Sequence, residues 1–168
     1  MTTVQARTQA KPPPALPTVG MGAIAGMRSM AAPALVSDYV TRTRPEQRGT
    51  PVQFLTSPRV ATVLKLLAVG ELVADKTPQI PARTDWPSLL GRCLSGTVAG
   101  AALYAGAGRH AIPGALLGGT VAALSTFGSY HLRQYVGRRF NLPDPLVGVI
   151  EDAIVIGGGI GLLRRLPR

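Results

Sequence analysis

Two carboxylates stand four residues apart in a largely apolar stretch, LLAVGELVADKTPQIP. On a helix, this spacing places the side chains of Glu71 and Asp75 on one face, where they can pair with bases or bind a proton or a cation. Lys76 follows directly, and Pro78 then favours the end of the helix. The role of these charges depends on whether the helix lies in water or in lipid.

The composition favours a protein of closely packed helices in a membrane. Of the 168 residues, 46% are hydrophobic and only 15% are charged, whereas soluble domains average about 25% charged residues. Glycine is abundant and aromatic side chains are scarce, which suits helices that approach one another through small residues. The length corresponds to one domain.

The net charge of +10 does not indicate a protein that binds nucleic acid. The basic residues form short clusters separated by long uncharged stretches, and no aromatic RNA-binding motif or zinc-ligand spacing accompanies them. Basic loops are instead usual beside membrane helices. Cys93 is the single cysteine, so we expect no disulfide within the chain, and we predict no metal site and no cofactor.

Five stretches are candidates to cross a bilayer, which takes about 20 largely apolar residues each. They are Val19–Val40, Pro58–Lys76, Leu89–Gly108, His110–Leu132 and Leu146–Leu163. We therefore predict an all-α fold: an integral membrane bundle of about five transmembrane helices, forming a single domain over 19–165 after a disordered Pro-rich tail over 1–18. Because the first two stretches are only modestly apolar, a soluble all-helical bundle remains the alternative.

Charged residues inside these stretches mark the candidate site, because each costs roughly a few kcal/mol in lipid unless it pairs or faces water. Glu71 is expected to face the bundle interior, opposite Arg28 or the Glu151–Asp152 pair. The acids and bases nearly balance, as mutual pairing requires. We predict a transport or ion-pair cluster of Arg28, Ser29, Glu71, Asp75, Lys76, Glu151 and Asp152.

Ordinary structural roles remain open for several of these residues. Asp75 and Lys76 also fit a helix end at the level of the lipid headgroups. Lys65, in the same stretch as Glu71, can extend its aliphatic stem to the surface. A buried ion pair of Arg28 can stabilise the bundle without binding a ligand.

Pairs of glycines four residues apart recur along the chain, a spacing that lets helices pack closely in lipid. The pairs are Gly22 with Gly26, Gly96 with Gly100, Gly114 with Gly118, and Gly157 with Gly161. Together they predict a tight bundle. Such pairs fit contacts within one chain and contacts between chains equally. The expected partners are therefore the lipid bilayer and, as an open alternative, further copies of the chain or a larger membrane complex.

An internal alignment predicts an inverted-topology repeat, in which spans one and two match spans four and five. GAIAGMRSMAAPALVS, from Gly22, aligns with GALLGGTVAALSTFGS, from Gly114. LLAVGEL, ending in Leu72, aligns less well with LVGVIED, ending in Asp152, and this second alignment places Glu71 opposite Glu151. One span separates the two halves, so matching helices would cross the bilayer in opposite directions, as in many transporters. The shared residues are few and mostly Gly or Ala, which makes the repeat a hypothesis. The basic residues outside the spans divide evenly between the two sides and predict no orientation.

Three short motifs occur in order along the chain: GMRSMAAPALVS in the first span, ELVADKTPQIPAR after the second, and PLVGVIEDAIVIGGG in the last. Together they resemble a bacterial family of small integral membrane proteins known as domain of unknown function 4126, over roughly Val19–Leu163. The resemblance implies a multi-spanning helical protein and brings no established activity. It would carry the family pattern onto Arg28, Ser29, Glu71, Asp75, Lys76, Pro78, Glu151 and Asp152.

We expect a small transporter or channel-like protein in the cytoplasmic (inner) membrane of a bacterium. Glu71 and Glu151 would be carboxylates that bind a proton or a cation, and Arg28 would be their counter-charge. The alternative is a structural or assembly subunit of a larger membrane complex, with the same charges in dry ion pairs. An enzyme is not expected, because the sequence contains no nucleophile–base motif and no phosphate-binding loop.

Overall fold

The computed structural model describes residues 14–43, 50–74, 85–140 and 143–166. Within these ranges the chain forms α-helices and one 3₁₀ turn, with no strand, which confirms the all-α prediction. The elements are α1 (Ala15–Met27), α2 (Ala31–Thr43), η1 (Gln53–Thr56), α3 (Pro58–Ala74), α4 (Trp86–Gly106), α5 (Ala111–Phe140) and α6 (Asp144–Arg164). Because α1 begins at Ala15, the end of the predicted disordered tail is helical.

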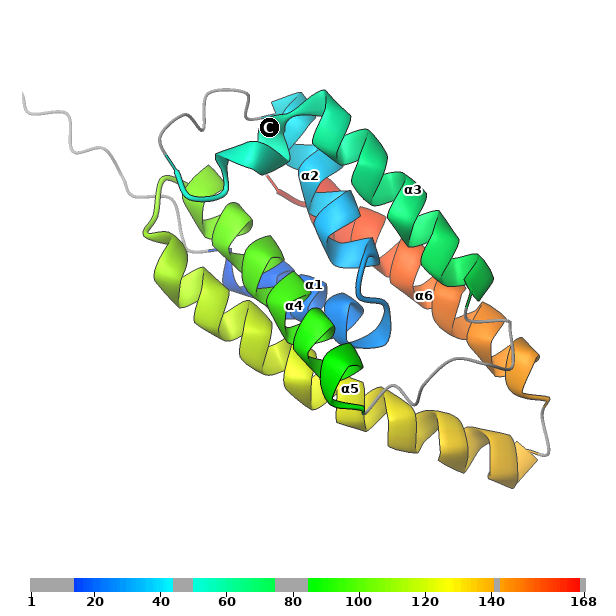
Figure 1. Cartoon of the computed structure of the whole chain (residues 1–168). Coiled ribbons are helices and arrows are strands. Elements are labelled where there is room, and N and C mark those ends of the chain that lie inside the picture. Colours follow the sequence, from blue (N-terminus) through cyan, green and yellow to red (C-terminus); the bar gives the residue numbers. More distant parts are fainter. Residues whose placement is uncertain (1–13, 44–49, 75–84, 141–142, 167–168) are drawn as a thin grey trace, which may run out of the picture.

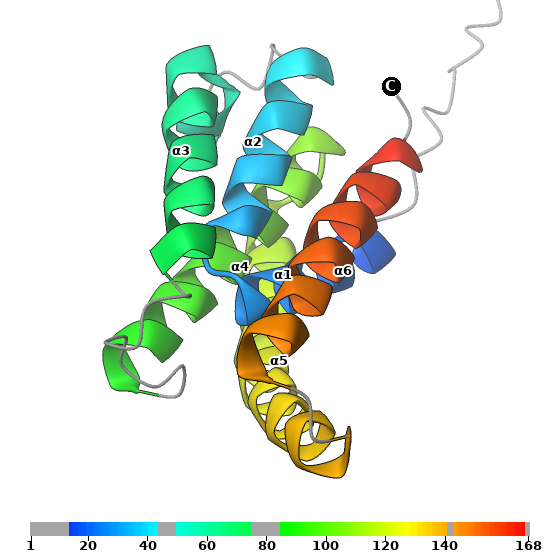
Figure 2. The same ribbon diagram turned by 90° about the vertical axis from the view of Figure 1, so that its right-hand side faces the viewer.

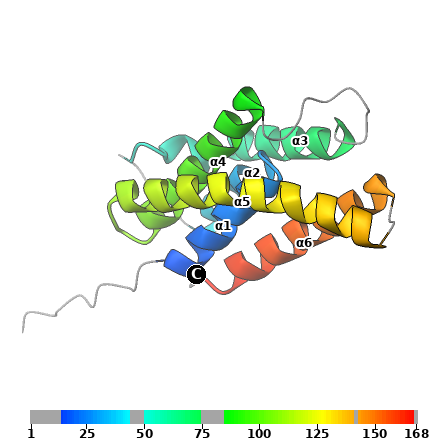
Figure 3. The same ribbon diagram turned by 90° about the horizontal axis from the view of Figure 1, so that it is seen from below.

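Three helices form the centre of the bundle. α4 and α5 run along each other as a hairpin, and α1 lies against both (Figure 1). The turn between α4 and α5 contains Gly108, whose φ of 71° lies in the left-handed region that favours glycine. α2 pairs with α3 on one side, and α6 packs against α1 and α2 (Figure 2). Seen from below, α5 extends along almost the whole length of the bundle (Figure 3).

Glycines bring α1, α4 and α5 into close contact. A Cβ atom added at Gly26 of α1 would lie only 2.5 Å from the carbonyl oxygen of Ala122 in α5. Three predicted glycine pairs pack within the chain in this way: Gly22 with Gly26, Gly96 with Gly100, and Gly114 with Gly118. In the fourth pair, Gly157 and Gly161 on α6, an added Cβ would meet no atom of the described residues within 4 Å.

The first predicted span, Val19–Val40, consists of two helices. α1 ends at Met27 and α2 begins at Ala31, and between them Arg28 is extended, with φ −139° and ψ 110°. Pro33 does not cause this break, because it lies in the first turn of α2, where a proline removes no internal hydrogen bond.

Two of the described helices are long and apolar enough to cross a membrane: α5 and the Leu146–Arg164 part of α6. α1 is apolar but shorter. The count of five spans therefore stays a prediction. α5 also continues from the predicted end at Leu132 to Phe140, because no proline interrupts the chain there.

The inverted repeat likewise stays a prediction, and the two halves differ in one respect. The first half breaks at Arg28, whereas α5 runs unbroken through Thr120, the residue that the alignment places opposite Arg28. The local interruption is therefore a property of the first half alone.

Replacing Gly118 by alanine should destabilise the bundle by about 1–3 kcal/mol, because the new Cβ would overlap the Gly96 carbonyl group. The matched control, Gly157→Ala, adds the same methyl group to a helical glycine with open space around it, and should be neutral or slightly stabilising. Thermal unfolding of both variants in detergent micelles measures the difference. Equal stabilities would contradict the close contact between α4 and α5.

Candidate functional site at the break between α1 and α2

Residues 28–30, here called the α1–α2 break, interrupt a helix inside the bundle. At such a break the last carbonyl groups of one helix and the first N–H groups of the next have no partner within their own helix. Each group costs roughly 1–3 kcal/mol if it is buried without a hydrogen bond. Side chains from α3, α4 and α5 supply the missing partners.

The carboxylate of Glu71, on α3, accepts three hydrogen bonds at the start of α2. The backbone N–H groups of Ser29 and Met30 each donate to it over 2.8 Å, and the Ser29 hydroxyl donates over 3.0 Å. The carboxylate thus serves as an N-terminal cap for α2. Its negative charge also suits the positive end of the α2 dipole.

The guanidinium group of Arg92, on α4, caps the other helix end at the break, the C-terminal end of α1. Its Nη1 atom donates to the carbonyl oxygens of Gly26 and Met27 over 2.8 and 2.7 Å. The residue is only 4% exposed. A cation at this position satisfies orphan carbonyl groups and suits the negative end of the α1 dipole.

Hydroxyl groups complete the hydrogen bonding of the α1–α2 break and of the end of α1. Ser95 of α4 donates to the Ser29 carbonyl oxygen. Thr126 of α5 is buried and lies 3.3 Å from the Gly26 oxygen, while Ser125 donates to Ala23 over 2.8 Å. These short side chains reach the backbone because glycines hold α1, α4 and α5 close together.

Arg28, within the break, forms an ion pair with Asp152 of α6. The Nη2 and Oδ1 atoms are 2.6 Å apart, and Arg28 is 2% exposed. Taking two charges out of water is costly, and a close pair offsets that cost. The pair therefore ties the break to α6, just as Glu71 ties it to α3.

The neighbouring acid on α6, Glu151, forms an ion pair with a different arginine, Arg133 of α5. Glu151 is 8% exposed, and its Oε2 atom lies 3.4 Å from Nη1 of Arg133. Adjacent residues on a helix point in different directions, so one acid reaches the break while the other reaches α5. The expected pairing of Arg28 with Glu71 or Glu151 is replaced by pairing with Asp152.

Four of the predicted site residues meet at the break: Arg28, Ser29, Glu71 and Asp152. Glu151 lies beside them in its own ion pair. Asp75 and Lys76 lie outside the described residues. Lys65 is not part of the cluster, because it pairs with Asp38 of α2 at the surface.

Arg92 and Arg133 are the site residues that sequence reasoning missed. Arg92 lies near the start of the third predicted stretch, Leu89–Gly108, and Arg133 lies just past the end of the fourth at Leu132, and neither is among the predicted site residues. In the structure α4 begins before Arg92 and α5 continues past Arg133. For Arg92 a signal was available. Ser88, Arg92 and Ser95 follow the spacing of four and three residues that marks one helix face, and this polar face has to be buried against a partner.

Two arginines and two carboxylates at the break, Arg28, Arg92, Glu71 and Asp152, sum to zero formal charge. Among the described residues, no group of three or more His, Cys, Asp or Glu side chains could hold a metal ion. The arrangement can bind a proton or a small ion at a carboxylate, but only if one of the present hydrogen bonds or ion pairs gives way.

Fold and site together define a class of protein. It is an all-α bundle in which α1 and α2 are separated by a break inside the bundle, and charged side chains of neighbouring helices bind the two helix ends at this break. The chain belongs to the family described as domain of unknown function (DUF4126), whose model matches residues 15–163. This range covers nearly everything from α1 to the end of α6 and confirms the resemblance drawn from the three motifs. No curated protein and no solved structure matches the chain.

Replacing Glu71 by glutamine should lower the unfolding free energy by about 1–3 kcal/mol. The amide keeps one acceptor oxygen, but its NH₂ group would face a backbone N–H and leave that donor unsatisfied. Chemical unfolding in detergent micelles measures the change. The control is Asp85→Asn, at an exposed residue before α4 that makes no capping hydrogen bond, and asparagine caps as well as aspartate. A loss no larger than that of the control would contradict the capping role.

The ion pair between Arg28 and Asp152 should appear as a strong coupling in a double-mutant cycle. Arg28→Gln and Asp152→Asn should each cost about 3–5 kcal/mol, because each removes one member of a close, largely buried ion pair. The double variant should cost clearly less than the sum of the two.

The matched control combines Asp152→Asn with Arg42→Gln, since Arg42 is exposed and pairs with Asp38 on α2. Here the two free-energy changes should add. Additive changes in the Arg28–Asp152 cycle itself would show that the pair contributes nothing beyond its separate residues.

Proposed function

We propose that this protein is a small multi-spanning membrane transporter or channel, located in the cytoplasmic membrane of a bacterium, and that the α1–α2 break is its ion-binding site in a closed state. α1 and α2 would form one interrupted span, and α3 to α6 would supply four more. α3 has 17 residues and α4 has 21, which correspond to about 26 and 32 Å of helix. These lengths are close to the hydrocarbon thickness of a bilayer, about 30 Å.

The outer faces of these helices support a membrane location. Large apolar side chains are exposed on every helix from α3 to α6, including Leu66 of α3, Leu94 of α4, Leu124 of α5 and Ile154 of α6. Soluble monomers rarely expose apolar side chains over such a wide area. Lipid would cover these faces, while the charged side chains of the α1–α2 break lie inside the bundle.

The single observation that carries the functional proposal is the charge-compensated break in the first span. In lipid, an interrupted helix is tolerated only where protein or a water-filled cavity surrounds it. In secondary transporters, such half-helix ends are the places that bind the substrate and the coupling ions. Here the two ends carry Glu71 and Arg92, charges of the sign that each helix end attracts.

The hydrogen bonds suggest how ion binding would be coupled to movement. A proton or a cation that binds Glu71 must compete with the N–H groups of Ser29 and Met30. Binding would therefore release the start of α2 from α3. The pair between Arg28 and Asp152 would remain as the second connection that has to open before the site meets water.

The structural subunit remains the second candidate, and two observations favour it. Arg28 and Glu151 are nearly inaccessible, and their ion pairs are closed. Gly157 and Gly161 on α6 leave an open face on which another helix would fit. In that case the same charges serve only to hold the bundle together.

Flux of protons and monovalent cations into proteoliposomes separates the two candidates. The wild-type protein should conduct, and Glu71→Gln and Glu151→Gln should each lower the flux at least about tenfold, since each removes an ionisable carboxylate. Asp38→Asn, which changes a surface acid paired with Lys65, is the control and should retain flux.

Folding of each variant is verified by circular dichroism and gel filtration in detergent. If the wild-type protein shows no flux under these conditions and the variants lose association with a larger membrane complex, the transporter is excluded in favour of the structural subunit.

A further inference from the structure

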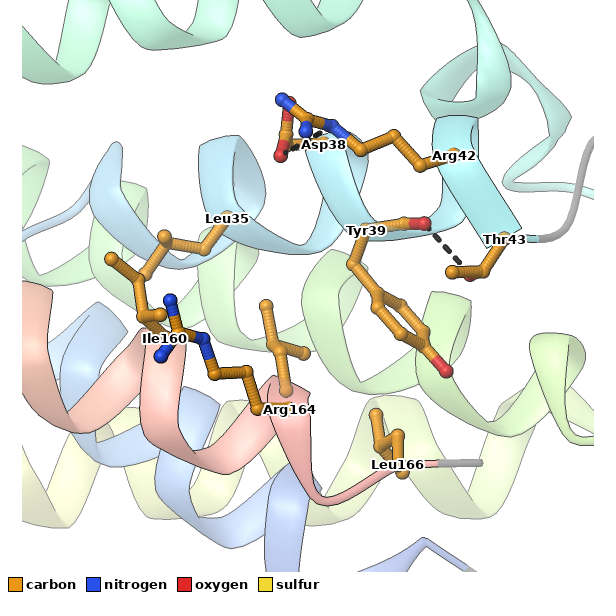
Figure 4. A pocket seen from close by; sticks show the side chains of 9 residues that line it. Leu35, Asp38, Tyr39, Arg42, Thr43, Ile160, Arg164 and Leu166 are labelled. Atoms are coloured by element: carbon orange, nitrogen blue, oxygen red, sulfur yellow. Dashed lines mark hydrogen bonds and ion pairs between the residues drawn. The ribbon is translucent and has the colours of Figure 1, made fainter. Parts of the chain in front are cut away.

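A cavity of about 810 Å³ lies between the second half of α2 and the end of α6 (Figure 4). This volume is within the range of pockets that bind small molecules, roughly 300–1,000 Å³. Its walls are apolar along one side, with Leu35 from α2 and Ile160 and Leu163 from α6. The Tyr39 ring extends from α2 toward Leu166 and forms one end of the cavity (Figure 4).

The described residues that line the cavity carry a positive excess. Asp38, the one acid among them, pairs with Arg42 at 3.1 Å and also with Lys65. Arg164 is exposed and forms no ion pair with any described residue. Its guanidinium group extends back along α6 toward Ile160, so an unneutralised cation stands directly beside the apolar wall (Figure 4).

We propose that this cavity binds one anionic phospholipid, with the phosphate at Arg164 and an acyl chain along Leu35 and Ile160. Arginine binds phosphate oxygens through two parallel hydrogen bonds, and basic pockets between membrane helices are suited to anionic headgroups. Arg164 ends α6, the position at which a helix leaves the hydrocarbon for the headgroup region. The inference depends on the membrane location given under the proposed function, but not on transport.

Two other ligand classes fit the cavity less well. A small soluble anion would neutralise Arg164 and leave the wall of Leu35, Ile160 and Leu163 without a hydrophobic partner. A zwitterionic phospholipid would bring a cationic group that needs an acid, and Asp38 is already engaged by two bases. Charge and apolarity together therefore select an anionic amphiphile.

The test is native mass spectrometry of the full chain in detergent micelles, titrated with phosphatidylglycerol or with phosphatidylcholine of the same acyl chains. The wild-type protein should bind one phosphatidylglycerol at least about tenfold more tightly than phosphatidylcholine. Arg164→Gln should remove this preference, a loss of about tenfold. The matched control is Arg165→Gln, which removes the same charge one residue further on, outside the cavity lining, and should change binding less than about twofold.

A second variant, Ile160→Trp, fills the apolar part of the cavity and leaves every charge in place. It should weaken the binding of phosphatidylglycerol while Arg164 is intact.

Equal losses for Arg164→Gln and Arg165→Gln would overturn the proposal, because they would show diffuse attraction to a basic helix end. Displacement of the lipid by an equal concentration of inorganic phosphate would overturn it too, since the site would then be a simple anion site. A protein that retains selective lipid binding but shows no flux would refute transport alone.

Discussion

An interrupted helix inside the bundle is the constraint on which the rest of the structure depends. The ends of α1 and α2 present carbonyl and N–H groups where water is scarce, and each must find a partner. α1 ends toward Arg92 and α2 begins at Glu71, so each helix end receives the charge that its dipole favours. The break is therefore a built feature of the fold, with a charged side chain of matching sign at each helix end.

The glycine packing and the hydrogen bonding of the break are parts of one arrangement. Gly26 lies where α1 touches Ala122 of α5, and its own carbonyl oxygen accepts from Arg92 and Thr126. A larger residue at this position would push α1 away from both donors. Close packing thus does more than add van der Waals contact, because it brings short polar side chains within reach of the backbone. This explains why small and hydroxyl-bearing residues share the same helix faces in α4 and α5.

Sequence reasoning predicted the helices better than the pairings between them. Apolar stretches bounded by proline and charge marked α3 to α6, and an arginine in an apolar run marked Arg28 as a residue that needs a partner. Which acid it meets depends on the rotation of α6 about its axis, and adjacent Glu151 and Asp152 cannot be told apart by sequence position. Arg92 was missed because it stands near the start of the predicted span Leu89–Gly108, where an arginine fits the membrane surface as well as the bundle interior.

α6 connects the charged break to α5 through two ion pairs that stand on adjacent residues. Its consecutive acids reach Arg28 in the break and Arg133 on α5, so a rotation or shift of α6 that frees one pair strains the other. Two ion pairs that must rearrange together favour two discrete arrangements over a continuous series, as packed interfaces generally do. The outer face of α6 offers little resistance to such a shift, since a Cβ atom added at Gly157 or Gly161 would meet no atom of the described residues within 4 Å. If the proposed ion-binding site opens, movement of α6 against α1 and α5 is therefore the rearrangement that would expose the buried charges with the least disruption of the glycine-packed centre.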